Sequence, residues 1–242
     1  MVQKADDLIG FTLHAIDGDI GRVHDIYFDD RDWTVRYLVV DTRHWLPGRR
    51  ILLSPVSIRQ TRRARREIVV SLSREQIRRS PSVDSDQPIG RRTFALFREC
   101  YTKPYYWALG GFFWGPGSTG PRRHPGSSRL RSTRLLSDYR VTAVDGDIGH
   151  VDGFLIDDRS WALCCLIVRT RHWPAGRRVL VPTEWVAWAS WIELTVHVDL
   201  PVERILHGPD YDPSQPITAP DQTRVMAYYG RAPRDRRDTR PA

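Results

Sequence analysis

The chain has 242 residues and a formal net charge of +8, and 40% of its residues are hydrophobic. No apolar run approaches the roughly 18 residues of a membrane-spanning helix, and the first residues lack the basic start and apolar core of a signal peptide. Three cysteines, Cys100, Cys164 and Cys165, are too few for a disulfide framework and favour a reducing compartment. These features exclude a disulfide scaffold and predict a cytoplasmic protein.

The positive charge is unevenly distributed. Counting Lys, Arg, Asp and Glu, the net charge is +2 over residues 1–90, +8 over 91–134, −5 over 135–218 and +3 over 219–242. A folded nucleic-acid-binding domain would carry its excess positive charge on the domain itself, whereas here the excess lies in residues 91–134 and 219–242. The distribution therefore argues against a nucleic-acid-binding domain, although basic arms can still bind polyanions.

An internal repeat fixes the domain organisation. Residues 43–50 (RHWLPGRR) recur as 171–178 (RHWPAGRR), and with this separation of 128 residues the segment from Leu8 to Ile89 aligns with its second copy without a gap. Each copy, about 82 residues long, is close to the size at which one core is only marginally stable. We therefore expect the two copies to pack on one another with pseudo-twofold symmetry.

These observations divide the chain into four parts. Residues 1–90 are the first repeat and 135–218 the second. Residues 91–134 form an aromatic strap, Tyr105–Trp114, followed by a flexible basic linker, and 219–242 form a C-terminal strap and a disordered tail.

Short strands follow one another in each repeat, with turn residues about every ten positions. In the first repeat the expected strands are 11–16, 20–28, 33–41, 51–53 and 68–72, followed by a short helix at 73–77; in the second, 161–168, 179–181 and 192–198 correspond, with a helix at 201–205. The pattern predicts an all-β fold made of two tandem small antiparallel β-barrels, each followed by a short helical segment.

Glycines and tryptophans recur at equivalent positions and are expected to shape the repeat. Glycine inside a strand marks a bulge or bend, so Gly21 and Gly149 predict a barrel corner. The full set of expected structural positions is Gly21, Trp33, Trp45 and Gly48, with Gly149, Trp161, Trp173 and Gly176 in the second copy.

The repeats resemble the PRC-barrel superfamily, which includes the cytoplasmic domain of the photosynthetic reaction centre H subunit and the C-terminal domain of the ribosome maturation factor RimM. The resemblance rests on the Asp-Gly-Asp-Ile-Gly turns at 17–21 and 145–149, the aspartate-rich turns before Trp33 and Trp161, the strand 37–42, and the Trp-x-x-Gly-Arg-Arg loops. In particular, the chain looks like bacterial tandem PRC-barrel proteins.

The resemblance implies a compact barrel that acts by contact. In the H subunit the barrel caps a membrane complex and influences electron and proton transfer to a quinone, and in the ribosome factor it helps to bind the assembling small subunit. This chain shows neither a transmembrane anchor nor the separate N-terminal domain of the ribosome factor, so neither role transfers directly.

No residue pattern predicts catalysis, a cofactor or a metal. Each copy offers a single histidine in its loop, His44 or His172, and no Cys/His spacing matches a zinc site. The acidic pairs Asp17/Asp19 and Asp29/Asp30 suit tight turns better than calcium. The paired arginines at 49–50 and 177–178 could grip phosphates, but pairing with the turn aspartates is favoured.

The copies differ most in their last hairpin. The first copy is basic there, with Arg59, Arg62, Arg63, Arg65 and Arg66, whereas the second carries Trp185, Trp188 and Trp191. Both sets are candidate partner surfaces, since aromatic residues and arginine are enriched at interfaces; a solvated hairpin and a covered seam between the repeats are the alternatives.

We therefore expect a non-enzymatic interaction or adaptor protein of the H-subunit-like type, cytoplasmic or peripheral to the inner membrane face. It would dock to a protein complex or to that membrane face and need neither a cofactor nor a small-molecule substrate. The alternatives are an RNA- or ribosome-associated factor that uses the hairpin 59–66, and an enzyme or ligand carrier, which would require a deep polar pocket.

Overall fold

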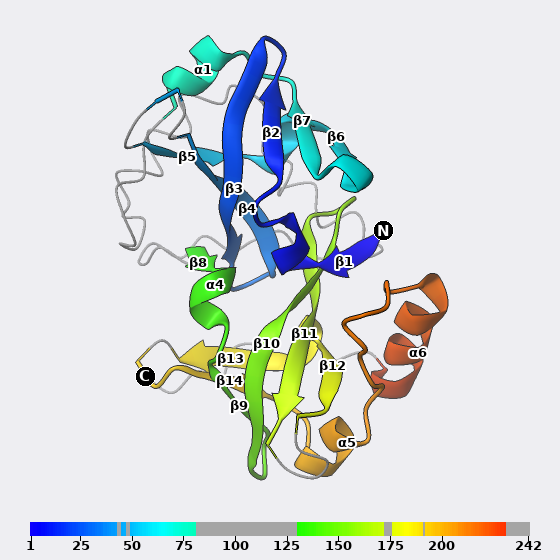
Figure 1. The fold of residues 1–242 in the computed structure, drawn as a ribbon. Coiled ribbons are helices and arrows are strands. Elements are labelled where there is room, and N and C mark those ends of the chain that lie inside the picture. The colour runs from blue at the N-terminus through cyan, green and yellow to red at the C-terminus, as the bar shows by residue number, and fades with distance from the viewer. Residues whose placement is uncertain (43–44, 47–48, 81–129, 172–175, 191, 231–242) are drawn as a thin grey trace, which may run out of the picture. The chain divides into compact units, whose positions relative to one another are not determined.

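The computed structural model describes residues 1–42, 45–46, 49–80, 130–171, 176–190 and 192–230. These residues are mainly β-strands joined by short helices, and they divide into two compact units (Figure 1). The N-terminal unit comprises residues 7–132, and the C-terminal unit comprises residues 1–6 together with 133–242.

The strands of the N-terminal unit pair in the order β6–β7–β2–β3–β4–β5, and β8 also pairs with β3. Three-residue 3-10 turns precede and follow β6, and a short helix follows β7. The elements are β2 (Thr12–Ala15), β3 (Gly18–Asp29), β4 (Thr34–Asp41), β5 (Arg50–Leu53), η2 (Pro55–Ser57), β6 (Ile58–Arg62), η3 (Arg63–Arg65), β7 (Glu67–Val70), α1 (Arg74–Arg78) and β8 (Leu130–Ser132).

The C-terminal unit has the corresponding order β13–β14–β9–β10–β11–β12, and β1 pairs with β10. The elements are β1 (Val2–Lys4), α4 (Thr133–Leu136), β9 (Arg140–Thr142), β10 (Asp147–Asp157), β11 (Ala162–Thr170), β12 (Arg178–Pro182), η5 (Thr183–Trp185), β13 (Val186–Ser190), β14 (Thr195–Val198), α5 (Val202–Leu206) and α6 (Ala219–Tyr229); η1 (Ala5–Leu8) joins β1 to the N-terminal unit.

The expectation of purely antiparallel sheets is wrong, because each unit contains one parallel pair. β2 runs parallel to β7, and β9 runs parallel to β14. The reason is geometric: β3 already lies on one edge of β2, so the later hairpin can join only at the other edge, which β7 reaches in the same direction as β2. The strand series is also open, since no described pairing joins β6 to β5 or β13 to β12.

Two strands that the sequence did not predict extend the units. β1 pairs with β10, with Gln3 opposite Ile156, and β8 pairs with β3, with Arg131 opposite Phe28. β1 and β8 lie 128 residues apart, so each precedes one repeat in sequence and pairs with the long strand of the other. Residues 130–134, expected as flexible linker, therefore form β8 and the start of α4.

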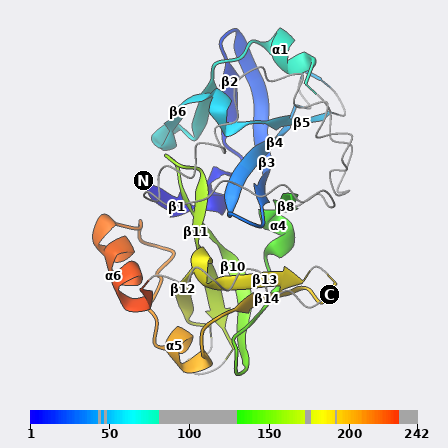
Figure 2. The ribbon, with the colours of Figure 1, turned by 180° about the vertical axis from the view of Figure 1, so that it is seen from behind.

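The C-terminal strap, for which the sequence predicted no secondary structure, contains a helix. Residues 219–229 of this strap form α6, which begins with a capping box between Thr218 and Asp221 and is followed by the C-cap residue Gly230. α6 packs beside β12, as both ribbon views show (Figures 1 and 2). Among the described helices, none is long and apolar enough to cross a membrane.

Two tryptophans anchor the turn that enters the central strand of each unit. Trp33 and Trp161 are each 7% exposed, and both adopt the left-handed conformation with φ of 55°. Their backbone N–H groups donate to the carbonyl oxygens of Asp29 (2.9 Å) and Asp157 (2.8 Å). The recurring aspartate-rich turn is therefore a device that buries a large aromatic ring where a tight turn ends.

The aspartates of the Asp-Gly-Asp turns do more than close a hairpin. Asp17 Oδ1 accepts a hydrogen bond from the Arg74 backbone N–H at 2.8 Å, and Asp145 Oδ1 accepts one from Val202 at 2.7 Å. Each carboxylate thus satisfies one of the free N–H groups at the start of the following helix. This contact links the first hairpin of each unit to its last helix.

Close backbone approach requires the glycines Gly21 and Gly149. A Cβ atom added at Gly21 would lie 2.0 Å from the carbonyl oxygen of Asp41, and one at Gly149 would lie 2.0 Å from that of Arg169. At this point β3 passes from pairing with β2 to pairing with β4. The glycine lets the long strand serve both neighbours.

Gly21→Ala should therefore destabilise the protein far more than Gly176→Ala, the matched control. The alanine Cβ at position 21 would force β3 and β4 apart, which should lower the free energy of unfolding by about 3 kcal/mol or more. Gly176 has φ of +81° but nothing within 4 Å of its added Cβ, so only the conformational cost of about 1 kcal/mol applies. Urea unfolding measures both; equal losses would contradict the role given to Gly21.

Candidate functional site

The first arginine of each Gly-Arg-Arg loop donates hydrogen bonds to backbone carbonyls at the end of a helix. Arg49 donates to the carbonyl oxygens of Arg78 (3.1 Å) and Ser80 (2.9 Å) at the end of α1. Its equivalent Arg177 donates to the carbonyl oxygens of Leu206 and Gly208 (2.9 Å) after α5. These guanidinium groups satisfy helix C-terminal carbonyls, so neither is available to grip a phosphate.

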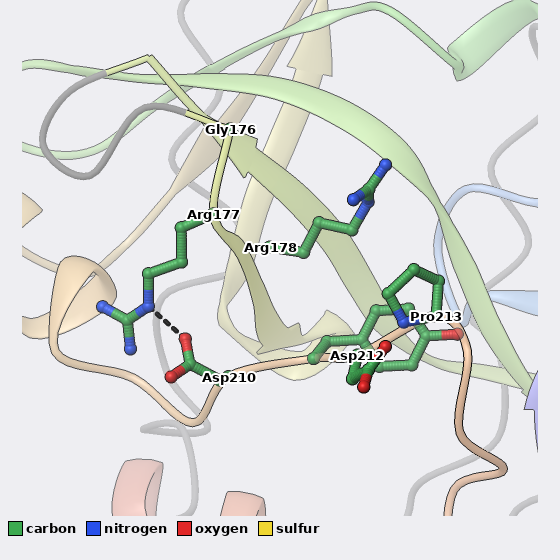
Figure 3. Close-up of a pocket in the computed structure, with 7 residues that line it drawn as sticks. Gly176, Arg177, Arg178, Asp210, Asp212 and Pro213 are labelled. Atoms are coloured by element: carbon green, nitrogen blue, oxygen red, sulfur yellow. Dashed lines mark hydrogen bonds and ion pairs between the residues drawn. The ribbon is translucent and has the colours of Figure 1, made fainter.

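One hollow of the C-terminal unit, about 630 Å³, surrounds the second of these arginines (Figure 3). It is lined by Gly176, Arg177, Arg178, Asp210, Tyr211, Asp212 and Pro213. The Nε of Arg177 donates to Asp210, and the Nε of Arg178 donates to Asp152 at 2.6 Å. The sequence analysis favoured pairing with the aspartates of the recurring turns, but Asp210 and Asp152 lie outside those turns. Both cations are neutralised, so the hollow offers no charge for an anionic ligand.

The residues considered as metal ligands do not form a site where they are described. Within the part of the chain that the structure describes, no three His, Cys, Asp or Glu side chains are grouped to hold a metal. His44 and His172 lie outside the described residues. Asp17 and Asp145 are committed to the helix starts described above.

The adjacent cysteines of β11 are buried or half-buried free thiols. The pairing of β10 with β11 skips one residue between Leu163 and Cys165, so Cys164 is the extra residue of a bulge. A side-chain hydrogen bond with Cys164 and then burial raise the pKa of the Cys165 thiol. The thiol therefore stays protonated and is a poor nucleophile.

Part of the basic hairpin, defined as Ile58–Val70, is structural. Arg66 has φ of 55°, donates to the carbonyl oxygen of Ile9 at 3.0 Å, and lies over the ring of Phe11 at 4.9 Å. Arg62, 44% exposed, approaches Glu67 at 3.4 Å. These two arginines have local roles.

The remaining arginines of the basic hairpin differ in exposure. Arg63 is half-buried, whereas Arg59 and Arg65 are exposed. Neither of the exposed pair makes an ion pair with any residue that the structure describes. The free positive charge on this hairpin is therefore smaller than the count of five arginines suggested.

The aromatic candidates of the second repeat do not form one exposed cluster. Trp185 is only 9% exposed, with Arg204 stacked 5.7 Å from its ring, so it belongs to the core and not to a partner surface. Trp188 is half-buried and stacks on His197, with ring centroids 3.5 Å apart. Trp191 lies outside the described residues.

The exposed apolar surface of the second hairpin lies at its tip instead. We define the apolar hairpin as Val186–Val198. Ile192 is 97% exposed and Leu194 is 53% exposed, and Leu194 adopts a left-handed conformation with φ of 52°. The sequence analysis missed these residues as surface candidates, because their spacing matches the alternation of the strand expected at 192–198. Their equivalents in the first repeat, Ala64 and Arg66, belong to the turn of the basic hairpin, and this correspondence could have identified them.

Burial makes the apolar hairpin sensitive to pH. Desolvation lowers the pKa of His197 below its ordinary value, against the opposing effect of Glu193 at 3.9 Å. The folded state thus prefers the neutral imidazole. Its free energy of unfolding should fall as the pH drops through about 6.5, because the histidine of the unfolded chain binds a proton there and the buried imidazole of the folded state binds one less readily.

We expect His197→Gln to reduce this loss of unfolding free energy between about pH 7 and pH 5. His207→Gln, a substitution at an exposed histidine of the same unit, is the control and should leave the slope unchanged. Denaturant titrations at each pH give the slope, and an identical slope in wild type and His197→Gln would refute the assignment.

Comparison with known proteins agrees with the geometry of the first repeat. A search of the curated proteins finds no match. The family model of the PRC-barrel domain matches residues 2–77, which run from β1 into α1 and include every strand of the N-terminal unit except β8. Residues 2–77 are therefore similar in sequence to the PRC-barrel domain.

Proposed function

We propose that the protein is a non-enzymatic adaptor that docks onto a protein complex through the apolar hairpin of its C-terminal unit. The observation that carries the proposal is the tip of this hairpin, where Ile192 is 97% exposed beside the 53% exposed Leu194. Isolated exposed apolar residues are common, but two of them at one turn favour a contact surface.

The comparison of the two units supports the proposal. Their strands have the same order and equivalent registers, such as Val23 opposite Val40 and Val151 opposite Val168. The two hairpins are equivalent elements with different surfaces, one basic and one apolar. Where two units share a framework and differ on one surface, that surface is the expected site of recognition.

The family match points in the same direction. The PRC-barrel domain matched by residues 2–77 is a protein-interaction type of module. Docking at the cytoplasmic face of a membrane has less support, because Glu193 is the only Asp, Glu, Lys or Arg between Val186 and Val198. A negative charge disfavours contact with anionic lipid. We place the adaptor in the cytoplasm, without a cofactor.

Partner capture from the native cell tests the proposal. Tagged full-length protein should enrich a defined set of proteins, and the Ile192→Ser/Leu194→Asn variant should lose at least about tenfold of that enrichment because the apolar contact is gone. Asparagine tolerates the left-handed conformation at 194, so the turn should persist. Arg59→Ala/Arg65→Ala is the matched control on the equivalent hairpin; loss in the control but not in the tip variant would reject the proposal.

Arg59 and Arg65 are exposed and make no ion pair with a described residue, which favours one alternative, an RNA-associated factor. RNA binding through both arginines would weaken steeply with salt, with a logarithmic slope of about −0.7 per phosphate contact on single strands. We expect instead that wild type and Arg59→Ala/Arg65→Ala bind RNA equally weakly at every salt concentration in a filter assay. A slope that is about 1.4 less steep in the variant would establish the alternative.

A further inference from the structure

We propose that β13, an edge strand of the C-terminal unit, receives an extended peptide segment of the protein partner, with alternating apolar and basic side chains. This inference rests on the proposed function and names the chemistry of the partner. The segment would add alongside β13, place its apolar side chains against Trp188 and Ile192, and place a lysine or arginine near Glu193.

The first argument is the edge itself. Among the described strands β13 pairs only with β14, through Trp188 opposite His197 and Ser190 opposite Thr195. The backbone N–H and C=O groups along its other edge can therefore pair with an extended segment of another chain. Extended peptides commonly bind in this way, with main-chain hydrogen bonds providing affinity and alternate side chains providing specificity.

The second argument is the contrast with β6, the equivalent edge strand. β6 carries Arg59 and Arg62 at positions where β13 carries Ala187 and Ser190. Charged side chains on an edge strand oppose pairing with another strand. Arginine side chains therefore oppose pairing with another strand at β6, whereas β13 carries no charged side chain that would oppose it.

The third argument is charge and apolar character. Glu193 is 65% exposed and lies 3.9 Å from His197, and it makes no ion pair with any Lys or Arg among the described residues. The segment Val186–Val198 itself contains no Lys or Arg. Ile192, at 97% exposure, continues the surface beyond the end of β13. A partner segment with both an apolar anchor and a positive charge complements this surface, since complementary potentials fix the register of association.

Binding of two short peptides to the full-length protein tests the inference. The first alternates lysine and valine over seven residues, and the second alternates glutamate and valine. We expect the lysine–valine peptide to cause saturable shifts of backbone amide resonances between Val186 and Leu194, with the glutamate–valine peptide at least about tenfold weaker. Glu193→Lys should reverse this preference.

Two matched variants locate the contact. Ala187→Arg introduces at β13 the charge that β6 already accommodates at Arg59, so the unit should remain folded, and peptide affinity should fall at least about tenfold. Arg59→Ala alters the equivalent strand and should leave affinity unchanged. Ile192→Ser, at the exposed tip, should also weaken binding and serves if Ala187→Arg perturbs the amide spectrum elsewhere.

Three outcomes would overturn the inference: equal affinity for the two peptides, no effect of Ala187→Arg and Ile192→Ser, or a lower sedimentation mass of Ala187→Arg than of wild type. The last result would mean that β13 pairs with a second copy of the chain. If capture from cells depends on the hairpin tip while the peptide results fail, the adaptor function stands and the extended basic peptide does not.

Discussion

The close contact between a glycine of the long strand and a backbone carbonyl of the next strand is the constraint on which each unit depends. At Gly21 and Gly149 any side chain would overlap the carbonyl oxygens of Asp41 and Arg169. Because the strands can approach there, β3 and β10 pair with the preceding strand along one half and with the following strand along the other. The remaining hairpin then joins the edge of β2 or β9 in parallel, which places its tip at the end of the strand series.

The residues that recur in the two repeats serve this framework. The aspartates at 17 and 145 accept hydrogen bonds from the start of a helix, and Arg49 and Arg177 donate to the carbonyls at its end. A helix of five residues has little stability alone, so both of its ends need such contacts. Among the described residues of the recurring loops these polar groups are committed to structure, and we propose that recognition resides in the hairpins, where the repeats differ.

Much of the fold follows from the sequence because its signals are local. Turn aspartates, strand glycines and alternating apolar residues place most strands of the first repeat within a few residues of the observed bounds. β1 and β8 escaped prediction because three-residue strands carry no periodicity and their pairing depends on distant partners. The parallel pairs were not predicted because the direction of β7 and β14 depends on which edge of β2 and β9 is left for pairing, and local sequence patterns do not show this. At the candidate site, Trp185 looked like a surface residue because its cover, Arg204, comes from a later helix. Ile192 and Leu194 looked like strand residues because their turn is set by backbone conformation.

The central claim is that the partner is recognised at the apolar hairpin and not at its basic counterpart. Hydrogen exchange measured by mass spectrometry on the full-length protein, free and in the complex isolated from its native cell, tests this claim most directly. The account predicts that complex formation slows amide exchange within Val186–Val198 and leaves exchange within Ile58–Val70 unchanged. Slower exchange in Ile58–Val70 alone, with Val186–Val198 as open as in the free protein, would contradict it.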